Sequence, residues 1–145
     1  MMASPRLLTL PQVAEMIGVE YRTLHSWLKR GLLRPSLQAS RGIGVPNLFS
    51  VRDAVRAKVV ADLRQSGLSF EKLEQASAEL ETHATALTEG AMVLVNGSVS
   101  VVDDTEAYTA IKKESLTLVY DTGYAVREIA AATSDRPVSV SAQSA

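Results

Sequence analysis

The sequence predicts an α+β chain in which four helices come first and a small module of strands and short helices follows. Apolar residues recur at helical spacing up to about residue 88, and side chains that cap helices precede the helical runs. After Gly90 the pattern changes, because 91–95 and 98–102 are β-rich runs that flank Asn96–Gly97, a strong hairpin signal. We therefore expect a helical N-terminal domain and a C-terminal module built on a β-hairpin.

Charge divides the chain into similar parts. Residues 1–68 carry ten Lys and Arg against four Asp and Glu, a net charge of +6, whereas residues 69–145 carry five against twelve, a net charge of −7. A basic part joined to an acidic part favours a nucleic-acid surface at one end and a different task at the other. Chance clustering on two solvated faces is the alternative, and charge by itself does not separate the two.

Composition argues against several classes of function. The chain has no cysteine, which removes disulfides, thiolate metal sites and thiol nucleophiles. No apolar run reaches membrane-spanning length, and the N-terminus lacks the apolar core of a signal peptide. We expect a cytoplasmic, nucleoid-associated protein without a membrane partner.

Two helices joined by a tight turn open the N-terminal domain. Thr9, with Gln12 three residues later, predicts the start of a first helix that ends at Gly18. A second helix is expected to begin near Glu20 and to stop at Gly31. Two helices connected by so short a glycine-containing turn are typical of a helix-turn-helix.

A small β-wing is predicted next. The stretches 32–35 and 47–49 flank a loop rich in Gly, Ser and Arg, and we expect them to form the wing. Its mobile tip is placed around Arg41, Gly42 and Gly44.

Two more helices complete the domain. Ser50 caps the third, with Asp53 at the reciprocal position, and this helix is expected to end at Gly67. Ser69 opens the fourth, which is expected to extend to about Thr88. The result is a winged helix-turn-helix domain over residues 6–85.

The C-terminal module is expected over residues 91–132, followed by a flexible, Ser- and Ala-rich tail over 133–145. After the hairpin, its elements are a short helix capped by Asp103 or Asp104 and ending at Lys113, a strand over 116–120, and a last short helix over 125–132.

A set of motifs in the first half keeps the order and spacing of a known family. The motifs are Leu8–Val19, Arg22–Leu24, Trp27, Gly31–Pro35, Leu48–Ser50, Asp53, Leu63 and Ser66–Ser69. In these residues the chain resembles the N-terminal domain of the MerR family of bacterial transcription regulators. The resemblance covers about half of the chain, and it implies DNA binding by a transcription regulator.

The chain also departs from the family pattern. His25-Ser26-Trp27-Leu28 stands where the family usually has Arg-Tyr-Tyr-Glu, and Val45-Pro46-Asn47 replaces a Tyr-Arg pair of the wing. The cysteines and the long dimerisation helix of the metal-sensing members are both missing. The resemblance therefore implies DNA binding but not metal sensing, and the target DNA sequence does not carry over.

The start of the second helix is the expected DNA-reading face. Arg22 matches the family's phosphate-contacting arginine, and Tyr21 and His25 are candidates for base or sugar contacts, with plain surface residues as the alternative. Trp27 is assigned to the core rather than to base stacking. The expected DNA-binding residues are Glu20, Tyr21, Arg22, Thr23, His25, Ser26, Lys29 and Arg30 at the second helix, Arg34, Arg41 and Asn47 at the wing, and Arg52 and Arg56 in the third helix.

The sequence contains no catalytic constellation. The two histidines, His25 and His83, have no ligand-spaced partners, helix capping explains Asp103–Asp104, and neither a phosphate-binding loop nor a dinucleotide motif is present. We expect a protein that is not an enzyme and that needs no metal and no cofactor.

The predicted function is sequence-specific binding of double-stranded DNA by a dimeric transcription regulator, in particular a repressor. We expect residues 91–132 to form a homodimerisation or partner-binding module, because short strands with open edges favour association. Folding back onto the helices of the same chain is the alternative. Two other functions stay open: an antitoxin that represses its own operon and holds a toxin, and an architectural or excision-type DNA-binding factor.

Overall fold

The structure, a computed structural model, describes residues 7–36, 47–83, 92–95, 98–113 and 118–143. Six helices and two small antiparallel sheets make up these residues, which confirms the expected α+β class. None of the described helices combines the length and the apolar character that crossing a membrane requires.

The helix-turn-helix forms as its local signals predict. α1 (Leu10–Ile17) begins at Thr9, whose hydroxyl oxygen accepts from the Gln12 N–H at 3.3 Å while the Thr9 N–H donates to Gln12 Oε1 at 2.8 Å. α1 ends at Gly18, which has φ 73°, a left-handed conformation that glycine adopts without steric cost. α2 (Tyr21–Lys29) follows after a short turn, with Leu24 buried against α1 in the common core.

The first small sheet is not the predicted pairing of the wing. β1 (Leu7–Leu8) lies antiparallel to β2 (Phe49–Ser50), so that Leu8 is opposite Phe49. The stretch 32–35 is not a strand, which corrects the prediction. The predicted tip of the wing, around Arg41, Gly42 and Gly44, lies outside the described residues.

Burial explains why 32–35 is not a strand. Leu32 and Leu33 are each 2% exposed, whereas a strand on a protein surface sends successive side chains to opposite faces. The backbone of Leu32 is also occupied by helices, because its N–H donates to the Trp27 carbonyl at 2.9 Å and its carbonyl accepts from the Ser77 hydroxyl at 2.8 Å. This stretch therefore serves as a buried connection between α2 and the helices that follow.

Two further helices form the centre of the molecule. α3 (Val51–Gln65) begins at Ser50, where the predicted capping box with Asp53 is present. α4 (Phe70–Thr82) begins at Ser69, whose hydroxyl oxygen accepts from the Lys72 N–H at 3.3 Å. α4 ends at Thr82 rather than near Thr88 as predicted; residues 84–91 lie outside the described part of the chain.

The C-terminal part contains a three-stranded sheet. β3 (Met92–Val95) and β4 (Val99–Val102) pair antiparallel as expected for a hairpin, although its predicted turn at Asn96–Gly97 lies outside the described residues. β5 (Leu118–Asp121) pairs with the other side of β3. Between β4 and β5 lies α6 (Asp104–Lys113), which Asp103 caps: its carboxylate accepts from the Glu106 N–H at 2.8 Å. The strand order is β4-β3-β5, so β4 and β5 are the edges.

The last helix is longer than predicted. α7 (Thr122–Gln143) covers the expected helix over 125–132 and most of the stretch predicted to be a flexible tail. Its first turns are anchored, because Thr122, Ala125 and Ile129 are each 0% exposed. A helix that is already nucleated extends readily through the alanines that follow, since alanine has the highest helix propensity.

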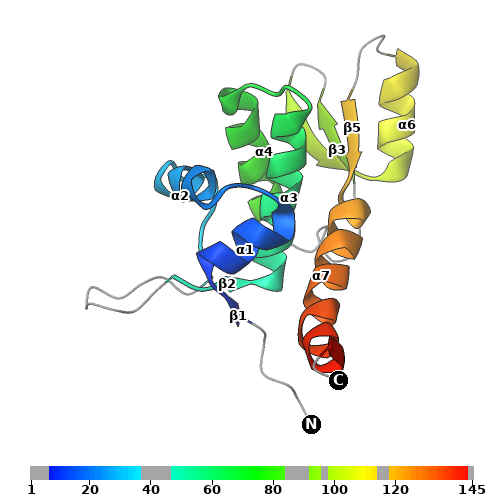
Figure 1. Ribbon diagram of the computed structural model, residues 1–145. Helices are drawn as coiled ribbons and strands as arrows, with labels where there is room; N and C mark the ends of the chain where they lie inside the picture. The colour runs from blue at the N-terminus through cyan, green and yellow to red at the C-terminus, as the bar shows by residue number, and fades with distance from the viewer. Residues whose placement is uncertain (1–6, 37–46, 84–91, 96–97, 114–117, 144–145) are drawn as a thin grey trace.

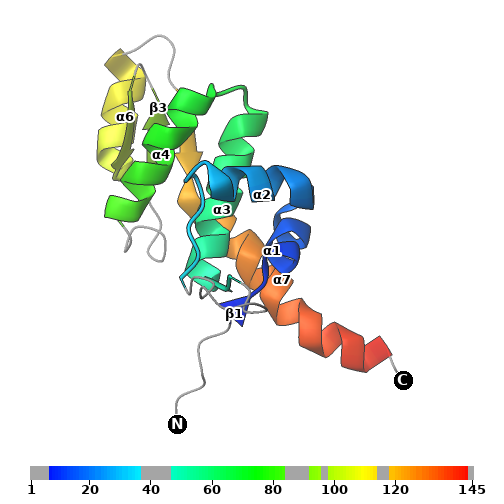
Figure 2. The ribbon, with the colours of Figure 1, turned by 90° about the vertical axis from the view of Figure 1, so that its left-hand side faces the viewer.

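The two parts of the chain share one hydrophobic core. Val93, Val99, Ala125 and Ile129 belong to the same buried cluster as the residues of α1 to α4. Figure 1 shows α3 and α4 at the centre, with α2 on one side and the sheet and α6 on the other; Figure 2 shows α7 leading away from α3 toward the C-terminus. Folding back onto helices of the same chain, the alternative considered from the sequence, therefore accounts for the buried face of residues 91–132.

A polar cluster holds the C-terminal part to α3. The Tyr120 hydroxyl donates to Asp62 Oδ2 at 2.5 Å, and Lys58 Nζ lies 3.3 Å from Asp62 Oδ1. Lys58 also lies over the Tyr124 ring, 5.6 Å from its centroid. Burial, and next the hydrogen bond to Asp62, raises the pKa of the Tyr120 phenol, so the hydroxyl stays protonated and remains a donor.

The two edges of the three-stranded sheet are not equivalent. On β4, the Val101 N–H donates to Glu79 Oε1 of α4 at 3.3 Å, and α4 packs along this strand. Within the described residues, β5 has a strand on one side only. An acceptor from another element therefore occupies an edge donor of β4, whereas none of the described strands pairs with the outer edge of β5.

Candidate nucleic-acid interface

α2 has one buried and one exposed face, and the sequence dictates which is which. Leu24 and Trp27, 0% and 7% exposed, fix the helix against the core. Trp27 is therefore a core residue, as predicted. On the other face Tyr21 is 52% exposed, and Arg22, Thr23 and Ser26 are exposed as well. A helix held by its apolar side and presenting polar side chains from its first turns has the form needed to enter a DNA major groove.

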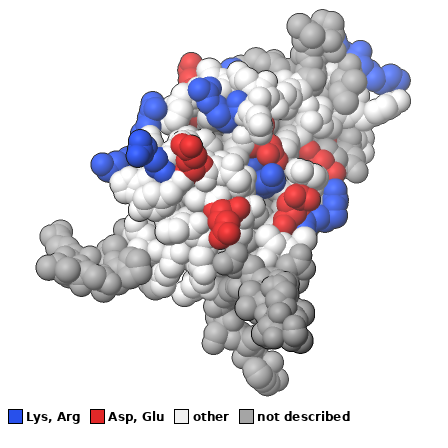
Figure 3. Space-filling model, viewed as in Figure 1, with Lys and Arg blue, Asp and Glu red and all other residues white. Residues whose placement is uncertain are grey.

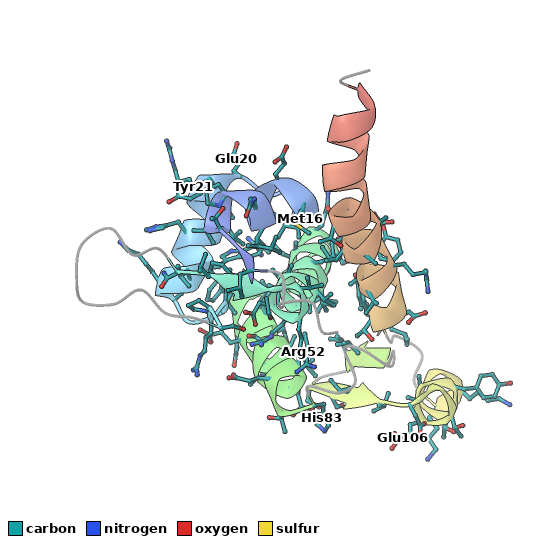
Figure 4. All side chains as sticks on the ribbon, turned by 90° about the horizontal axis from the view of Figure 1, so that it is seen from below. Met16, Glu20, Tyr21, Arg52, His83 and Glu106 are labelled. Carbon is teal, nitrogen blue, oxygen red and sulfur yellow. The ribbon has the colours of Figure 1, made fainter. Side chains whose placement is uncertain are left out.

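Glu20 precedes α2 and leaves its carboxylate unused by the helix. It occupies the N-cap position without a side-chain capping hydrogen bond. In Figure 4, Glu20 and Tyr21 lie next to each other and point outward from this end of α2. A free carboxylate at the start of such a helix can accept from a cytosine amino group, although it repels phosphates.

Tyr21 and His25 form a ring pair on the surface of α2. Their centroids are 5.8 Å apart and their planes are tilted by 33°. The four-residue spacing that suggested a common face is therefore matched by a contact between the rings. The pair places two aromatic rings side by side on the surface of α2, and such rings can contact a base or a deoxyribose.

The C-terminal end of α2 is basic, and one of its arginines is held in place from outside the helix. Lys29 and Arg30 are exposed, and the Arg30 guanidinium carbon lies 3.4 Å from the centroid of the Phe70 ring. This stacking leaves the N–H groups at the rim of the guanidinium plane able to donate to a phosphate. Figure 3 shows a group of Lys and Arg side chains over α2.

The start of the predicted wing is less basic than the sequence suggests. Arg34 Nη1 lies 3.7 Å from Glu81 Oε2 in an exposed ion pair, so part of the charge is offset. Asn47 is half-buried. Both residues border a surface depression of about 340 Å³ between the end of α2 and the base of the predicted wing, lined by Leu28, Lys29, Gly31, Leu33, Arg34, Pro35 and Asn47.

The two arginines predicted in α3 differ from each other. Arg52 is exposed, but in Figure 4 it lies near the middle of the view, apart from Glu20 and Tyr21. The Arg56 side chain is only 11% exposed, and its Nη2 lies 3.4 Å from Asp53 Oδ1. Arg41 lies outside the described residues. The predicted residues of α2 therefore lie together on one helix, whereas Arg52 lies apart from Glu20 and Tyr21 and the Arg56 side chain is mostly buried.

Comparison with known proteins decides the family. Residues 8–80, half of the chain, match the sequence model of the family described as MerR HTH family regulatory protein. The chain belongs to this family. Three relatives, one from Mycobacterium bovis and two from strains of Mycobacterium tuberculosis, are 30% identical to it over 66 residues. Each is named an uncharacterized HTH-type transcriptional regulator.

Membership of the MerR family sets the class of function. The family consists of DNA-binding transcription regulators and is not a class of enzymes. The matched region coincides with α1 to α4, so the C-terminal sheet and α7 lie outside it. The alignment covers 46% of this chain and 29% of each mycobacterial relative, so the chain spans less than a third of the length of those proteins.

Sequence reasoning missed two residues of this MerR-family surface. Phe70 orders Arg30 although the two are forty positions apart, and Glu81 pairs with Arg34 from the far end of α4. No local pattern predicts either contact, because each depends on how α4 packs against the end of α2. An aromatic residue directly after the Ser69 cap was the only available signal.

Proposed function

We propose that the chain binds double-stranded DNA sequence-specifically through α2 and acts as a transcription repressor. The exposed face of α2 carries this proposal: Tyr21 paired with His25, with Arg22 alongside, on a helix whose opposite face is buried. Arg22 supplies a sequence-independent phosphate contact, and the ring pair with Glu20 supplies contacts to base edges.

Footprinting across the genome with the tagged full-length protein tests the proposal. We expect discrete protected sites, and a duplex carrying such a site should bind the purified chain with an affinity that falls as salt rises. A protein that protects no discrete sites, or whose affinity is unchanged between low and physiological salt, contradicts the proposal.

The Arg22→Ala variant separates phosphate contacts from base contacts. The plot of log affinity against log salt concentration should become shallower by about 0.9, because one phosphate is no longer neutralised. Affinity should fall by a similar factor on specific and on random duplexes. Lys113→Ala is the matched control, since Lys113 is an exposed cation on α6, remote from α2 in Figure 1, and its loss should leave the slope unchanged.

Repression is proposed because it requires fewer interactions than activation does. Occupying a promoter requires only DNA binding, whereas activation also requires a defined effect on the polymerase or on promoter shape. A reporter driven by a promoter that overlaps the footprint should become more active when the gene for this chain is deleted. Lower reporter activity after deletion identifies an activator and contradicts this part of the proposal.

We also propose that the chain acts as a dimer through the open edge of β5, inside the segment 91–132. The apolar residues Val93 and Val99 do not support association, because they are buried in the chain's own core. The support is the asymmetry of the sheet: an edge donor of β4 is occupied by Glu79, and β5 is open among the described residues. A two-fold pairing of β5 strands presents two α2 helices to a symmetric operator.

Light scattering on the full chain tests the dimer, and paired variants test the edge. Val119 on β5 and Ser100 on β4 share one cross-strand row, since each is opposite Leu94. Val119→Lys should shift a dimer to monomer, whereas Ser100→Lys should not, because a charge on an edge strand opposes pairing at that edge only. A wild-type chain that is monomeric at micromolar concentration contradicts the dimer. The partner of the β5 edge would then be another protein.

A further inference from the structure

Asp53 is a buried residue whose carboxylate has three polar contacts and whose backbone N–H has a fourth. It is 5% exposed. Oδ2 accepts from the Ser50 N–H at 2.9 Å and from the Ser36 hydroxyl at 2.6 Å, and Oδ1 lies 3.4 Å from Arg56 Nη2. The Asp53 N–H in turn donates to the Ser50 hydroxyl oxygen at 3.1 Å. Only the two contacts with Ser50 belong to ordinary helix capping.

The contacts of Asp53 with Ser36 and Ser50 join residues on the two sides of segment 37–46. Ser36 is the residue directly before this segment, and Ser50 stands three residues after Asn47, the first described residue beyond it. One carboxylate oxygen therefore bonds a residue on each side. The hydrogen bond from Ser36 to Asp53 joins residues seventeen positions apart.

Arg56, three residues after Asp53 in α3, supplies the cation next to its carboxylate. A buried carboxylate costs free energy unless a cation or donors compensate it, and the Arg56 guanidinium supplies that compensation one turn along the helix. Arg56 Nε is itself buried and has no hydrogen-bond partner among the described residues. A side chain aimed at reaching a DNA phosphate would leave these nitrogens at the surface, whereas here they face inward.

We infer that Ser36, Asp53 and Arg56 form a polar staple that holds two stems, residues 33–36 and 47–50, in position for DNA contact, and that Arg56 is a positioning residue rather than a phosphate contact. This inference rests on the proposed DNA binding. It changes the role of Arg56, which sequence reasoning placed on the DNA backbone, and it gives Ser36 a role that no motif suggested. Asp53 suits this position because a carboxylate only accepts, and every group around it donates.

Salt dependence distinguishes a positioning residue from a phosphate contact. Arg56→Met keeps the length of the side chain and removes its charge. We expect weaker binding with the salt slope of the wild type, in contrast to Arg22→Ala, which should lose about 0.9 of the slope. A slope reduced by about 0.9 in Arg56→Met overturns the inference, because it identifies a direct phosphate contact.

Ser36→Ala tests the staple without altering any charge, and it remains informative if Arg56→Met folds poorly. We expect affinity for a footprinted duplex to fall by about threefold to tenfold, because one hydrogen bond to a charged group is lost. In the DNA-free protein, amide exchange over 33–36 and 47–50 should become faster. Ser66→Ala is the matched control, since the Ser66 hydroxyl also donates to an acceptor, the Asp62 carbonyl at 3.1 Å, but away from the stems.

The outcomes separate the staple from the proposed function. If the wild type binds no DNA, the proposed function fails, and the exchange measurement still tests whether Ser36 holds the stems. If the wild type binds DNA but Ser36→Ala changes neither affinity nor amide exchange relative to Ser66→Ala, the staple is wrong and DNA binding stands.

Discussion

The two parts of this molecule, the N-terminal part with the proposed DNA-reading face (residues 7–83, here called the DNA-reading part) and the C-terminal part (residues 92–143), differ in surface but not in core. The first presents Tyr21 and the cations around α2, and the second presents a sheet and α6 on the opposite side. Yet Val93 and Ile129 of the second part are buried among residues of the first. Charge in a sequence therefore indicates where surfaces differ, and it does not indicate where one folding unit ends.

The largest expected effect tests whether the core is truly shared. Ile129→Ala removes a fully buried side chain of α7 and should destabilise the chain by about 2–5 kcal/mol. Urea unfolding followed by tryptophan fluorescence reports on the DNA-reading part alone, because Trp27 is the only tryptophan.

A shared core moves the Trp27 transition and the far-ultraviolet circular dichroism transition together. Glu128→Ala, an exposed neighbour on the same helix, is the control and should shift neither. If Ile129→Ala left the Trp27 transition in place, the two parts would be independent folding units.

The second effect is a loss of about 1–3 kcal/mol in the free energy that separates binding to the specific site from binding to random DNA. Tyr21→Ala removes one ring of the exposed pair and should reduce the preference for the footprinted site over a random duplex. Because Tyr21 is 52% exposed, the unfolding midpoint should hardly change. Competition binding measures the preference. An unchanged preference would show that Tyr21 does not contact the bases.

A third effect, of about 1.5 kcal/mol, is expected for the polar contact between the two parts. Tyr120→Phe removes the hydrogen bond to Asp62 and leaves the ring in place. The Trp27 transition should shift, and Asp62→Ala should cost less in the Tyr120→Phe background than in the wild type, because the hydrogen bond is already lost there and only the ion pair with Lys58 remains to be removed. Fully additive losses would show that Tyr120 and Asp62 act separately.

The smallest effect concerns an exposed ion pair inside the DNA-reading part. Glu81→Gln removes the partner of Arg34, and since both side chains are exposed, stability should change by at most about 0.5 kcal/mol. Binding to DNA should tighten slightly at low salt, because the full charge of Arg34 becomes available. A clear loss of stability would show that this pair matters more to the fold than to the interface.

Local signals predicted the fold well wherever they act through the backbone. Thr9, Ser50, Ser69 and Asp103 mark the starts of their helices correctly, because a capping side chain bonds to amides within three residues of itself. The hairpin β3–β4 followed from the change of period after Gly90. Such signals need no knowledge of the rest of the chain.

Features that depend on long-range contacts could not be predicted from such local signals. The stretch 32–35 has strand-like composition, but the Ser77 hydroxyl of α4 donates to the Leu32 carbonyl, which is therefore not available to a neighbouring strand. Arg56 was placed on DNA although Asp53 lies three residues before it, a spacing that already indicated an ion pair along a helix. The stack of Arg30 on Phe70 had no such signal, because only the packed helices bring these two residues together.

The bond from the Val101 N–H to Glu79 has a consequence for solubility. A sheet that offers strand edges on both sides can add copies without limit and grow into a filament, whereas a sheet with one available edge stops at a closed pair. By occupying a donor on β4 from within the chain, Glu79 removes one of the two directions of growth. We therefore expect Glu79→Ala to make the purified chain more prone to aggregate.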